Sequence, residues 1–127
     1  MQLLLIFCGS GLGGLARFLL SKGISELNWI NFPLGTLTVN LLGCLACGFL
    51  SGLFENLFIS AELRAFVFIG FLGGFTTFST FGLESFNLAK EGAFATFLLN
   101  IIFNVLPGLL LVFLGYLLAR LLLAGRA

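Results

Sequence analysis

The chain of 127 residues contains no histidine and very few charged side chains. Lys, Arg, Asp and Glu together make up 9% of it, whereas soluble domains carry about 25%. So few charged residues cannot coat a soluble domain of this size, and 60% of the chain is hydrophobic. The composition therefore predicts an integral membrane protein within a lipid bilayer. A net charge of +1 gives no indication of a nucleic-acid partner.

The lack of histidine also argues against an enzyme, because histidine is the commonest acid–base catalyst and metal ligand. No nucleophile–base pair or set of metal-ligating side chains is visible in the sequence. Cys44 and Cys47 have the spacing of a redox pair, but they lie in an apolar stretch, where cysteine packs as a small hydrophobic residue. We therefore expect no catalytic residues.

Long apolar runs predict one all-α transmembrane domain over residues 1–127. The four expected membrane-spanning helices cover about residues 3–21, 32–54, 63–88 and 93–123. Small residues in the first span, including Gly9 and Gly13, predict close helix–helix packing. The string Gly9-x-Gly11-x-x-Gly14 matches a dinucleotide fingerprint only by accident, since the strand and acidic residue that this motif requires are missing.

The third span contains a stretch that is poor helix interior. Gly73 and Gly74 are followed closely by the β-branched residues Thr76 and Thr77. A helix broken inside hydrocarbon exposes backbone groups, and this is tolerated only in a protein-lined cavity or around an ion. The sequence therefore predicts a break in the third helix at an ion site.

Two ion chemistries suit the residues around this break. Phe78 and Phe81 are spaced to share one helix face, and the positive edges of their rings can accept an anion. Backbone carbonyls freed by the break favour a cation such as Na⁺, and both ions can be accommodated together. Hydroxyl and amide side chains would replace part of the water shell; these are Asn40, Thr77, Ser79, Thr80, Asn100 and Asn104.

Two charged residues near the membrane allow two interpretations each. Arg17 could be an anchor that extends to the membrane surface, or it could attract an anion into a vestibule. Glu84 could be a functional carboxylate at membrane depth, or it could simply reach the interface, because Lys90 and Glu91 follow soon after.

The positive charges do not specify an orientation in the membrane. With four spans, three basic residues fall on each side: Arg64, Arg120 and Arg126 on one, and Arg17, Lys22 and Lys90 on the other. Under the positive-inside rule such a chain can insert both ways. Two copies could then pair antiparallel about an axis in the membrane plane.

The motifs of three spans closely resemble those of the Fluc/CrcB fluoride channels. In the third span these are residues 70–81, G-F-L-G-G-F-T-T-F-S-T-F, followed by Glu84. The second span contributes Gly35-Thr36-Leu37-x-Val39-Asn40-x-x-Gly43, and the first contributes Gly13-Gly14-x-Ala16-Arg17. The resemblance covers nearly the whole chain in order.

This resemblance implies an antiparallel, dual-topology homodimer with two fluoride pathways and a central structural Na⁺. Gly73 and Thr76 would supply backbone carbonyls to Na⁺. The fourth span has Pro107-Gly108 and Val112 where some family members have hydroxyl residues, so that Asn100, Asn104 or water would take over that part. The implied fluoride pathway comprises Arg17, Asn40, Phe78, Ser79, Thr80, Phe81 and Glu84, with Asn104 from the fourth span.

The sequence thus predicts a passive fluoride channel in the cytoplasmic (inner) membrane of a prokaryote, which lowers the fluoride concentration in the cytoplasm. One alternative is a small dual-topology multidrug/proton antiporter, but its first span would need a membrane-embedded acid, and residues 3–21 contain none. A second alternative is a non-transporting scaffold subunit. A scaffold would explain the small-residue faces but not the hydroxyl-rich break.

Overall fold

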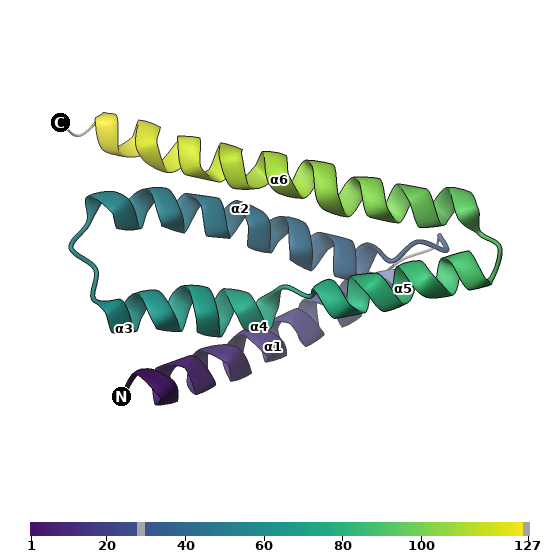
Figure 1. The fold of residues 1–127 in the computed structure, drawn as a ribbon, viewed down its shortest axis with the longest axis horizontal. Helices are drawn as coiled ribbons and strands as arrows, with labels where there is room; N and C mark the ends of the chain where they lie inside the picture. Colours follow the sequence, from purple (N-terminus) through teal and green to yellow (C-terminus); the bar gives the residue numbers. More distant parts are fainter. Residues whose placement is uncertain (28–29, 126–127) are drawn as a thin grey trace.

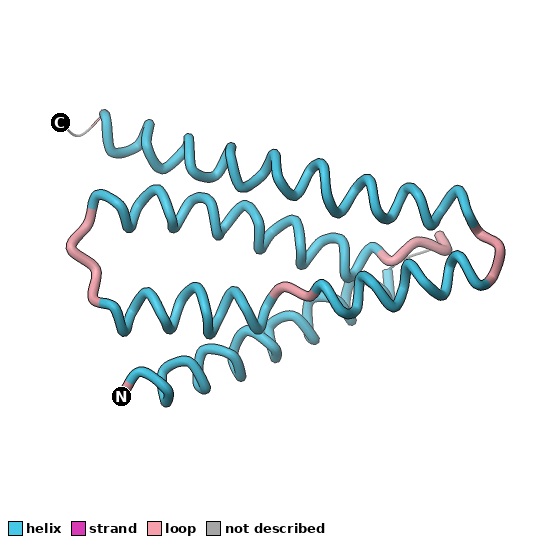
Figure 2. The backbone as a smooth tube through the Cα atoms, in the orientation of Figure 1, coloured by secondary structure: helices cyan, strands magenta, loops and turns pink. Residues whose placement is uncertain are grey.

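The computed structural model describes residues 1–27 and 30–125, so Arg126 lies outside the described residues. Within them the chain is helical, with connecting segments and no strand (Figure 2). Long apolar helices cross back and forth, and α1 begins at the end of the bundle where α6 finishes (Figure 1). Four helical segments in the described part are long and apolar enough to span a membrane: α1 (Gln2–Leu27), α2 (Leu34–Asn56), Ala61–Lys90, and α6 (Phe94–Ala124). The predicted all-α architecture is confirmed.

The third span is divided, as the sequence predicts. Its first part comprises α3 (Ala61–Arg64), the π-helical η1 (Ala65–Leu72) and α4 (Gly73–Phe75), and its second part is α5 (Phe78–Lys90). Between them, Thr76 (φ −83°, ψ 159°) and Thr77 (φ −149°, ψ 115°) are extended. The helix continues through Gly73 and Gly74 and breaks only at the threonines.

The helices pack by close backbone contact at glycine positions. A Cβ atom added at Gly13 of α1 would overlap the carbonyl oxygen of Phe71 in η1. In the α2–α6 pair, a Cβ added at Gly48 would overlap the carbonyl of Val112. The predicted small-residue packing face of the first span is therefore present, and it lies against the first part of the third span.

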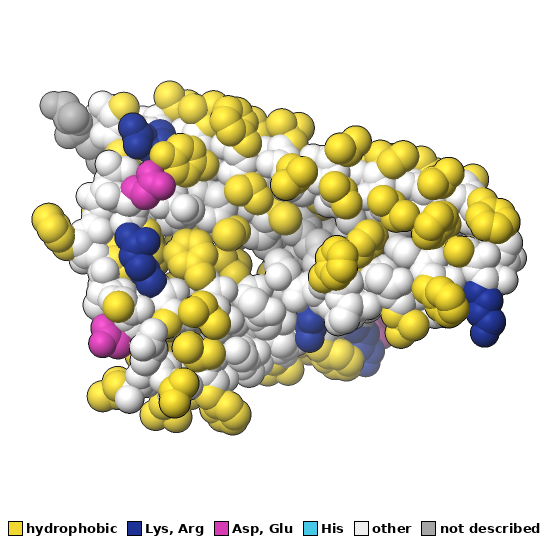
Figure 3. All heavy atoms as spheres, viewed as in Figure 1, with side chains coloured by type: hydrophobic (Ala, Val, Ile, Leu, Met, Phe, Trp, Pro, Cys, Tyr) yellow, Lys and Arg dark blue, Asp and Glu magenta, His cyan; other side chains and the backbone are white. Residues whose placement is uncertain are grey.

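The outer surface is suited to lipid. Hydrophobic side chains cover much of the visible face along its length, whereas a group of charged side chains lies near one end (Figure 3). Phe7 on α1 is one of many large apolar residues exposed on the single chain. This pattern agrees with a multi-pass membrane protein whose apolar faces meet hydrocarbon or another chain.

Candidate functional site

The break in the third span is held by one side chain from α2. The Thr77 backbone N–H donates to Asn40 Oδ1 at 2.8 Å, and Asn40 Nδ2 donates to the Thr77 carbonyl at 3.1 Å. The Asn40 amide thus pairs with both backbone groups of a residue that a continuous helix would have paired internally. An unsatisfied backbone group in hydrocarbon costs several kcal/mol, so Asn40 is part of what makes the break stable.

The threonine hydroxyls complete the two helix ends at the break. Thr77 is the N-cap of α5: its Oγ1 accepts from the Thr80 N–H at 3.2 Å and donates to Thr80 Oγ1 at 2.9 Å. On the other side, the Thr76 N–H and hydroxyl both donate to the Leu72 carbonyl, at 3.0 and 2.9 Å. Ser79 is exposed, with its Oγ 3.4 Å from Thr77 Oγ1.

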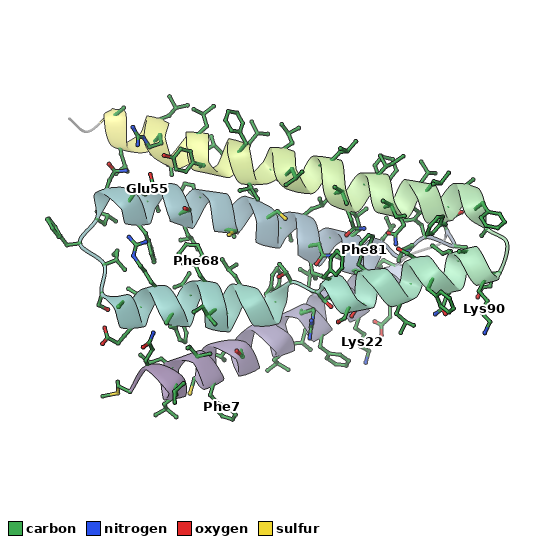
Figure 4. The ribbon with its side chains drawn as sticks, viewed as in Figure 1. Phe7, Lys22, Glu55, Phe68, Phe81 and Lys90 are labelled. Carbon is green, nitrogen blue, oxygen red and sulfur yellow. The ribbon has the colours of Figure 1, made fainter. Side chains whose placement is uncertain are left out.

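The two phenylalanines that follow the break are adjacent but differ in environment. Their ring centroids lie 5.5 Å apart, with the planes tilted by 59°. Phe81 is only 7% exposed, whereas Phe78 is 81% exposed on the single chain. Phe81 lies where α5 faces α2, and Phe68 from η1 also lies between the third span and α2 (Figure 4).

An open cleft of about 380 Å³ lies between α2, the third span and α6. A hollow is visible near the middle of the face in Figure 3. The cleft is mostly apolar, and its polar groups come from the break and from two amides. Its lining includes Asn40, Cys44, Cys47, Phe68, Gly73, Thr76, Thr77, Phe78, Phe81 and Asn104.

The two asparagines that the sequence analysis named on the fourth span, Asn100 and Asn104, join the Asn40 amide. Asn40 Nδ2 donates to Asn104 Oδ1 at 3.0 Å. Asn104 Nδ2 in turn donates to the side-chain and backbone oxygens of Asn100, both at 3.0 Å. Asn100 is 0% exposed and donates to Ser85 Oγ at 3.0 Å. A run of hydrogen bonds, part-buried at Asn40 and Asn104 and buried at Asn100 and Ser85, therefore links α2, α6 and α5.

A second cleft, of about 320 Å³, lies on the α1 side of the break. Arg17 and Lys22 line it together with hydroxyls that include those of Thr36 and Thr80. Arg17 Nη1 lies 3.3 Å from the Thr76 carbonyl oxygen, so its guanidinium group contacts the break instead of extending to the membrane surface. Two cations beside hydroxyl groups make this cleft attractive to anions.

Glu84 lies farther along α5, beside a third cleft of about 480 Å³. The Thr36 hydroxyl donates to Glu84 Oε1 at 2.7 Å. Glu84 Oε2 is buried and has no hydrogen-bond partner within the described part of the chain. Asn87 and Glu91 also line this cleft.

The structure distributes the predicted residues, apart from Ser79, over three clefts. The cleft between α2 and α6 collects most of them, Arg17 and Thr80 share the cationic cleft, and Glu84 faces the third. Sequence reasoning missed two participants, Thr36 and Ser85. Thr36 precedes Asn40 by four residues on α2, which is a signal that the two share a face. Ser85 gave no signal, because a single serine in an apolar helix is unremarkable.

The backbone at the break could bind a cation through carbonyl oxygens. The Thr77 N–H, which in a continuous helix would bond the Gly73 carbonyl, is taken by Asn40. Gly73 is exposed and borders the cleft, as does Thr76. The described residues contain no cluster of three or more His, Cys, Asp or Glu that could hold a metal. A hard carbonyl oxygen such as that of Gly73 fits Na⁺, whereas the Thr76 carbonyl already accepts from Arg17, and two oxygens cannot surround an ion unless a second copy contributes more.

Comparisons with known proteins agree on one family. Residues 4–116 match the family described as CrcB-like protein, Camphor Resistance (CrcB). A Pyrococcus furiosus protein named fluoride-specific ion channel FluC is 48% identical over 120 residues, which cover 94% of this chain and 96% of that protein. A protein of the same name from Phocaeicola vulgatus is 45% identical, covering 90% and 94%. Another, from Methylobacillus flagellatus, is 43% identical and covers 91% of each.

Proposed function

This chain belongs to the CrcB family, and from that premise we propose that it is a fluoride-selective ion channel. It lets fluoride leave the cytoplasm passively, in the cytoplasmic membrane of a prokaryote. The observation that carries the proposal is the broken third span, where Asn40 and the Phe78–Phe81 pair border an open cleft. The relatives named above are channels, and the chain is a transport protein and not an enzyme.

The cleft offers fluoride weak and replaceable partners. Amide N–H groups can donate hydrogen bonds to the ion, and tilted aromatic rings can offer it their positive edges. Among the described residues no Lys or Arg borders this cleft, so none of them would hold the anion in place as a strong counter-ion. Conduction requires binding that is favourable enough for entry and weak enough for exit.

The other two clefts both lie toward the α5 end of the bundle, so they border the same half of the pathway. Arg17 and Lys22 attract fluoride into the cationic cleft, where Thr80 of α5 lines the wall. Beyond Phe81, the pathway follows α5 toward Glu84 and its partner Thr36. Ser79 is exposed beside the break and would contact the ion only at an edge of the path.

The functional unit of the proposal is an antiparallel homodimer. Phe78 is 81% exposed beside a cleft that is open to the side, and a second copy would cover both. The basic residues of the described chain are also nearly balanced: Arg64 and Arg120 lie near one end, and Arg17, Lys22 and Lys90 lie toward the other. Such a chain has little bias toward one orientation.

Mixed orientation can be measured with a single reporter cysteine. In a chain whose Cys8, Cys44 and Cys47 are replaced by alanine, Lys90→Cys is labelled in intact cells with a membrane-impermeant maleimide. Dual insertion predicts labelling of roughly half of the molecules, since neither orientation is favoured. Labelling of all or none of them would show a fixed orientation.

Na⁺ would be held by the Gly73 and Thr76 carbonyls of both copies. Its proposed role is structural, since it would neutralise carbonyl dipoles where the two breaks meet. The expected readout is higher thermal stability of the purified dimer in Na⁺ than in an equal concentration of N-methylglucamine. Equal thermal stability in the two solutions would contradict a structural role for Na⁺.

Ion flux from liposomes tests the function itself. Purified protein should release fluoride from loaded liposomes and should not release chloride. The double substitution Phe78→Ile and Phe81→Ile should block this flux while the protein still purifies as a dimer. Proton-coupled transport of an organic cation without fluoride flux would favour an antiporter. The only acid in α1 is Glu26, which is exposed and paired with Lys22 at 3.9 Å, and this does not favour that alternative.

A further inference from the structure

The hydrogen bonds that run from the break into α6 have a fixed direction. The Thr77 backbone N–H can only donate, so the Asn40 atom that faces it must be Oδ1. Asn40 Nδ2 then has one N–H on the Thr77 carbonyl and a second that needs another acceptor, which is Asn104 Oδ1. The orientation of both amides is therefore set by one backbone group.

The same logic continues to the far end of the run. Asn104 Nδ2 faces the two oxygens of Asn100, so Asn100 Nδ2 must face Ser85 Oγ. The Ser85 hydroxyl then donates to the Phe81 carbonyl at 2.8 Å. We call the four side chains Asn40, Asn104, Asn100 and Ser85 the amide relay; it begins at a backbone N–H and ends at a backbone carbonyl.

With its hydrogen bonds in the observed direction, the relay disfavours an anion beside Asn40. Both N–H groups of Asn40 are in use, one on the Thr77 carbonyl and one on Asn104 Oδ1. Fluoride accepts hydrogen bonds and cannot donate them. An ion that takes the second N–H of Asn40 therefore meets the Asn104 oxygen, which repels it.

We infer that fluoride reverses the relay, and that Asn100 and Ser85 are the positioning residues that allow it; this rests on the proposed channel function. The Asn104 side-chain amide flips, so that its nitrogen and oxygen exchange places. Its Nδ2 then joins Asn40 Nδ2 in donating to fluoride. Its Oδ1 then faces Asn100, whose amide also turns to donate to it. The Asn100 oxygen now faces Ser85.

Ser85 is the member that makes reversal possible. A hydroxyl can donate or accept by rotating its proton, so it donates to the Asn100 oxygen in the reversed state. The Phe81 carbonyl that it leaves lies inside α5 and keeps its helical partner four residues along the chain. Ser85 and Asn100 are both buried, so water does not replace either group. Each side chain of the relay thus has a hydrogen-bond partner in both directions, although on reversal Asn104 gives up its bond to the Asn100 backbone carbonyl.

If fluoride reverses the relay, Ser85 and Asn100 control the passage of an ion that they do not contact. Ser85→Ala and Asn100→Leu should each lower fluoride flux about tenfold or more, because a buried amide then lacks a partner in one or both states. Ser85→Thr retains the hydroxyl and should restore most of the flux. Asn56→Leu is the matched control: Asn56 Nδ2 donates to the Gly52 carbonyl at 3.0 Å near the end of α2, outside the relay, so flux should be unchanged.

A spectroscopic readout separates reversal from a structural effect. Protein labelled with ¹⁵N-asparagine is titrated with fluoride, with chloride as the control, and the side-chain NH₂ signals are followed by NMR. The signals of Asn40 and Asn104 should shift with fluoride, and that of Asn100 should shift with the same midpoint. In the Ser85→Ala variant the Asn40 response should remain and the Asn100 response should disappear.

Two results would overturn the inference while leaving the channel intact: wild-type flux in Ser85→Ala, or an Asn100 signal that ignores fluoride in the wild-type protein. If Ser85→Ala unfolds, the Asn100 signal of the wild-type protein still decides. Failure of the wild-type protein to conduct fluoride would instead reject the proposed function.

Discussion

The two parts of the third span, before and after Thr76 and Thr77, are held in the bundle by different interactions. The first part, η1 and α4, packs backbone to backbone on α1, with Gly13 against Phe71 and Gly74 against Ser10. The second part, α5, is held by polar side chains of α2 and α6 that reach the break and Ser85. The first part therefore depends on shape, and the second depends on hydrogen-bond donors. A channel needs both, because exchangeable donors must be supported by a rigid frame.

The largest expected effect comes from a substitution that disturbs the packing of the first part against α1. Gly13→Ala places a Cβ inside the Phe71 carbonyl, and backbone cannot move as a side chain can. We expect a loss of more than about 3 kcal/mol in the free energy of unfolding, at the upper end for overpacking. Thermal unfolding in detergent measures it. Gly11→Ala, where nothing lies within 4 Å, should be neutral or slightly stabilising. Equal melting of the two variants would contradict the comparison.

The next largest effect is expected when hydrogen-bond donors beside the second part are removed. Asn40→Asp keeps the size of the side chain and can still accept from the Thr77 N–H, but it cannot donate to the Thr77 carbonyl or to Asn104. We expect fluoride flux to fall about a hundredfold, since two donated hydrogen bonds are lost and a negative charge is added. Liposome efflux provides the measurement. Near-normal flux would show that the Asn40 amide is not a partner of the ion.

A smaller effect is expected at the junction of the two parts. Thr77→Val removes the hydroxyl that caps α5 at the Thr80 N–H, which should cost about 1 kcal/mol of stability. Thr77→Ser keeps the hydroxyl and should unfold close to the wild-type temperature. If valine and serine behave alike, the cap does not stabilise the start of α5.

At the two outer ends of the span we expect an effect at Arg64 no larger than that at Thr77, and the smallest effect of all at Lys90. Arg64, at the start of the third span, donates to the Phe54 carbonyl and lies over the Phe54 ring at 5.8 Å. Arg64→Ala should cost about 1 kcal/mol in thermal unfolding. Lys90, at the other end, is exposed, and Lys90→Ala should stay within about 0.5 kcal/mol of the wild type. A larger cost at Lys90 would reverse the assigned order.

Much of this architecture could be predicted from the sequence, because few backbone structures are stable across a membrane. Apolar runs predicted four helices, and Gly9 and Gly13 predicted a close packing face, which the α1–η1 contact confirms. The break was also predicted, but it was attributed to the glycines and threonines together. The structure places it at the threonines alone, because Asn40 on α2 pairs with both backbone groups of Thr77.

What could not be predicted depends on partners that are distant in sequence. Arg17 bonds the Thr76 carbonyl, and Thr36 bonds Glu84, across separations of 59 and 48 residues. Nothing local to Arg17 or Thr36 indicates such a bond. The first helix also continues to Leu27, beyond residue 21, where the apolar run was expected to end. Lys22 and Glu26 pair along the exposed side of this extension. The periodicity of a helix indicates which residues share a face, whereas only the folded structure shows which residues of different helices form hydrogen bonds.

The π-helical segment η1 has an evolutionary consequence. Each of its turns takes in one residue more than an α-turn, because its bonds close on the fifth residue and not the fourth. A gene that gains or loses a codon there could absorb the change by converting a turn, and Arg64 and Gly74 would keep their neighbours. The same change within α5 would rotate every later side chain by about 100° and separate Ser85 from Asn100. Length variation in this span should therefore concentrate before the break.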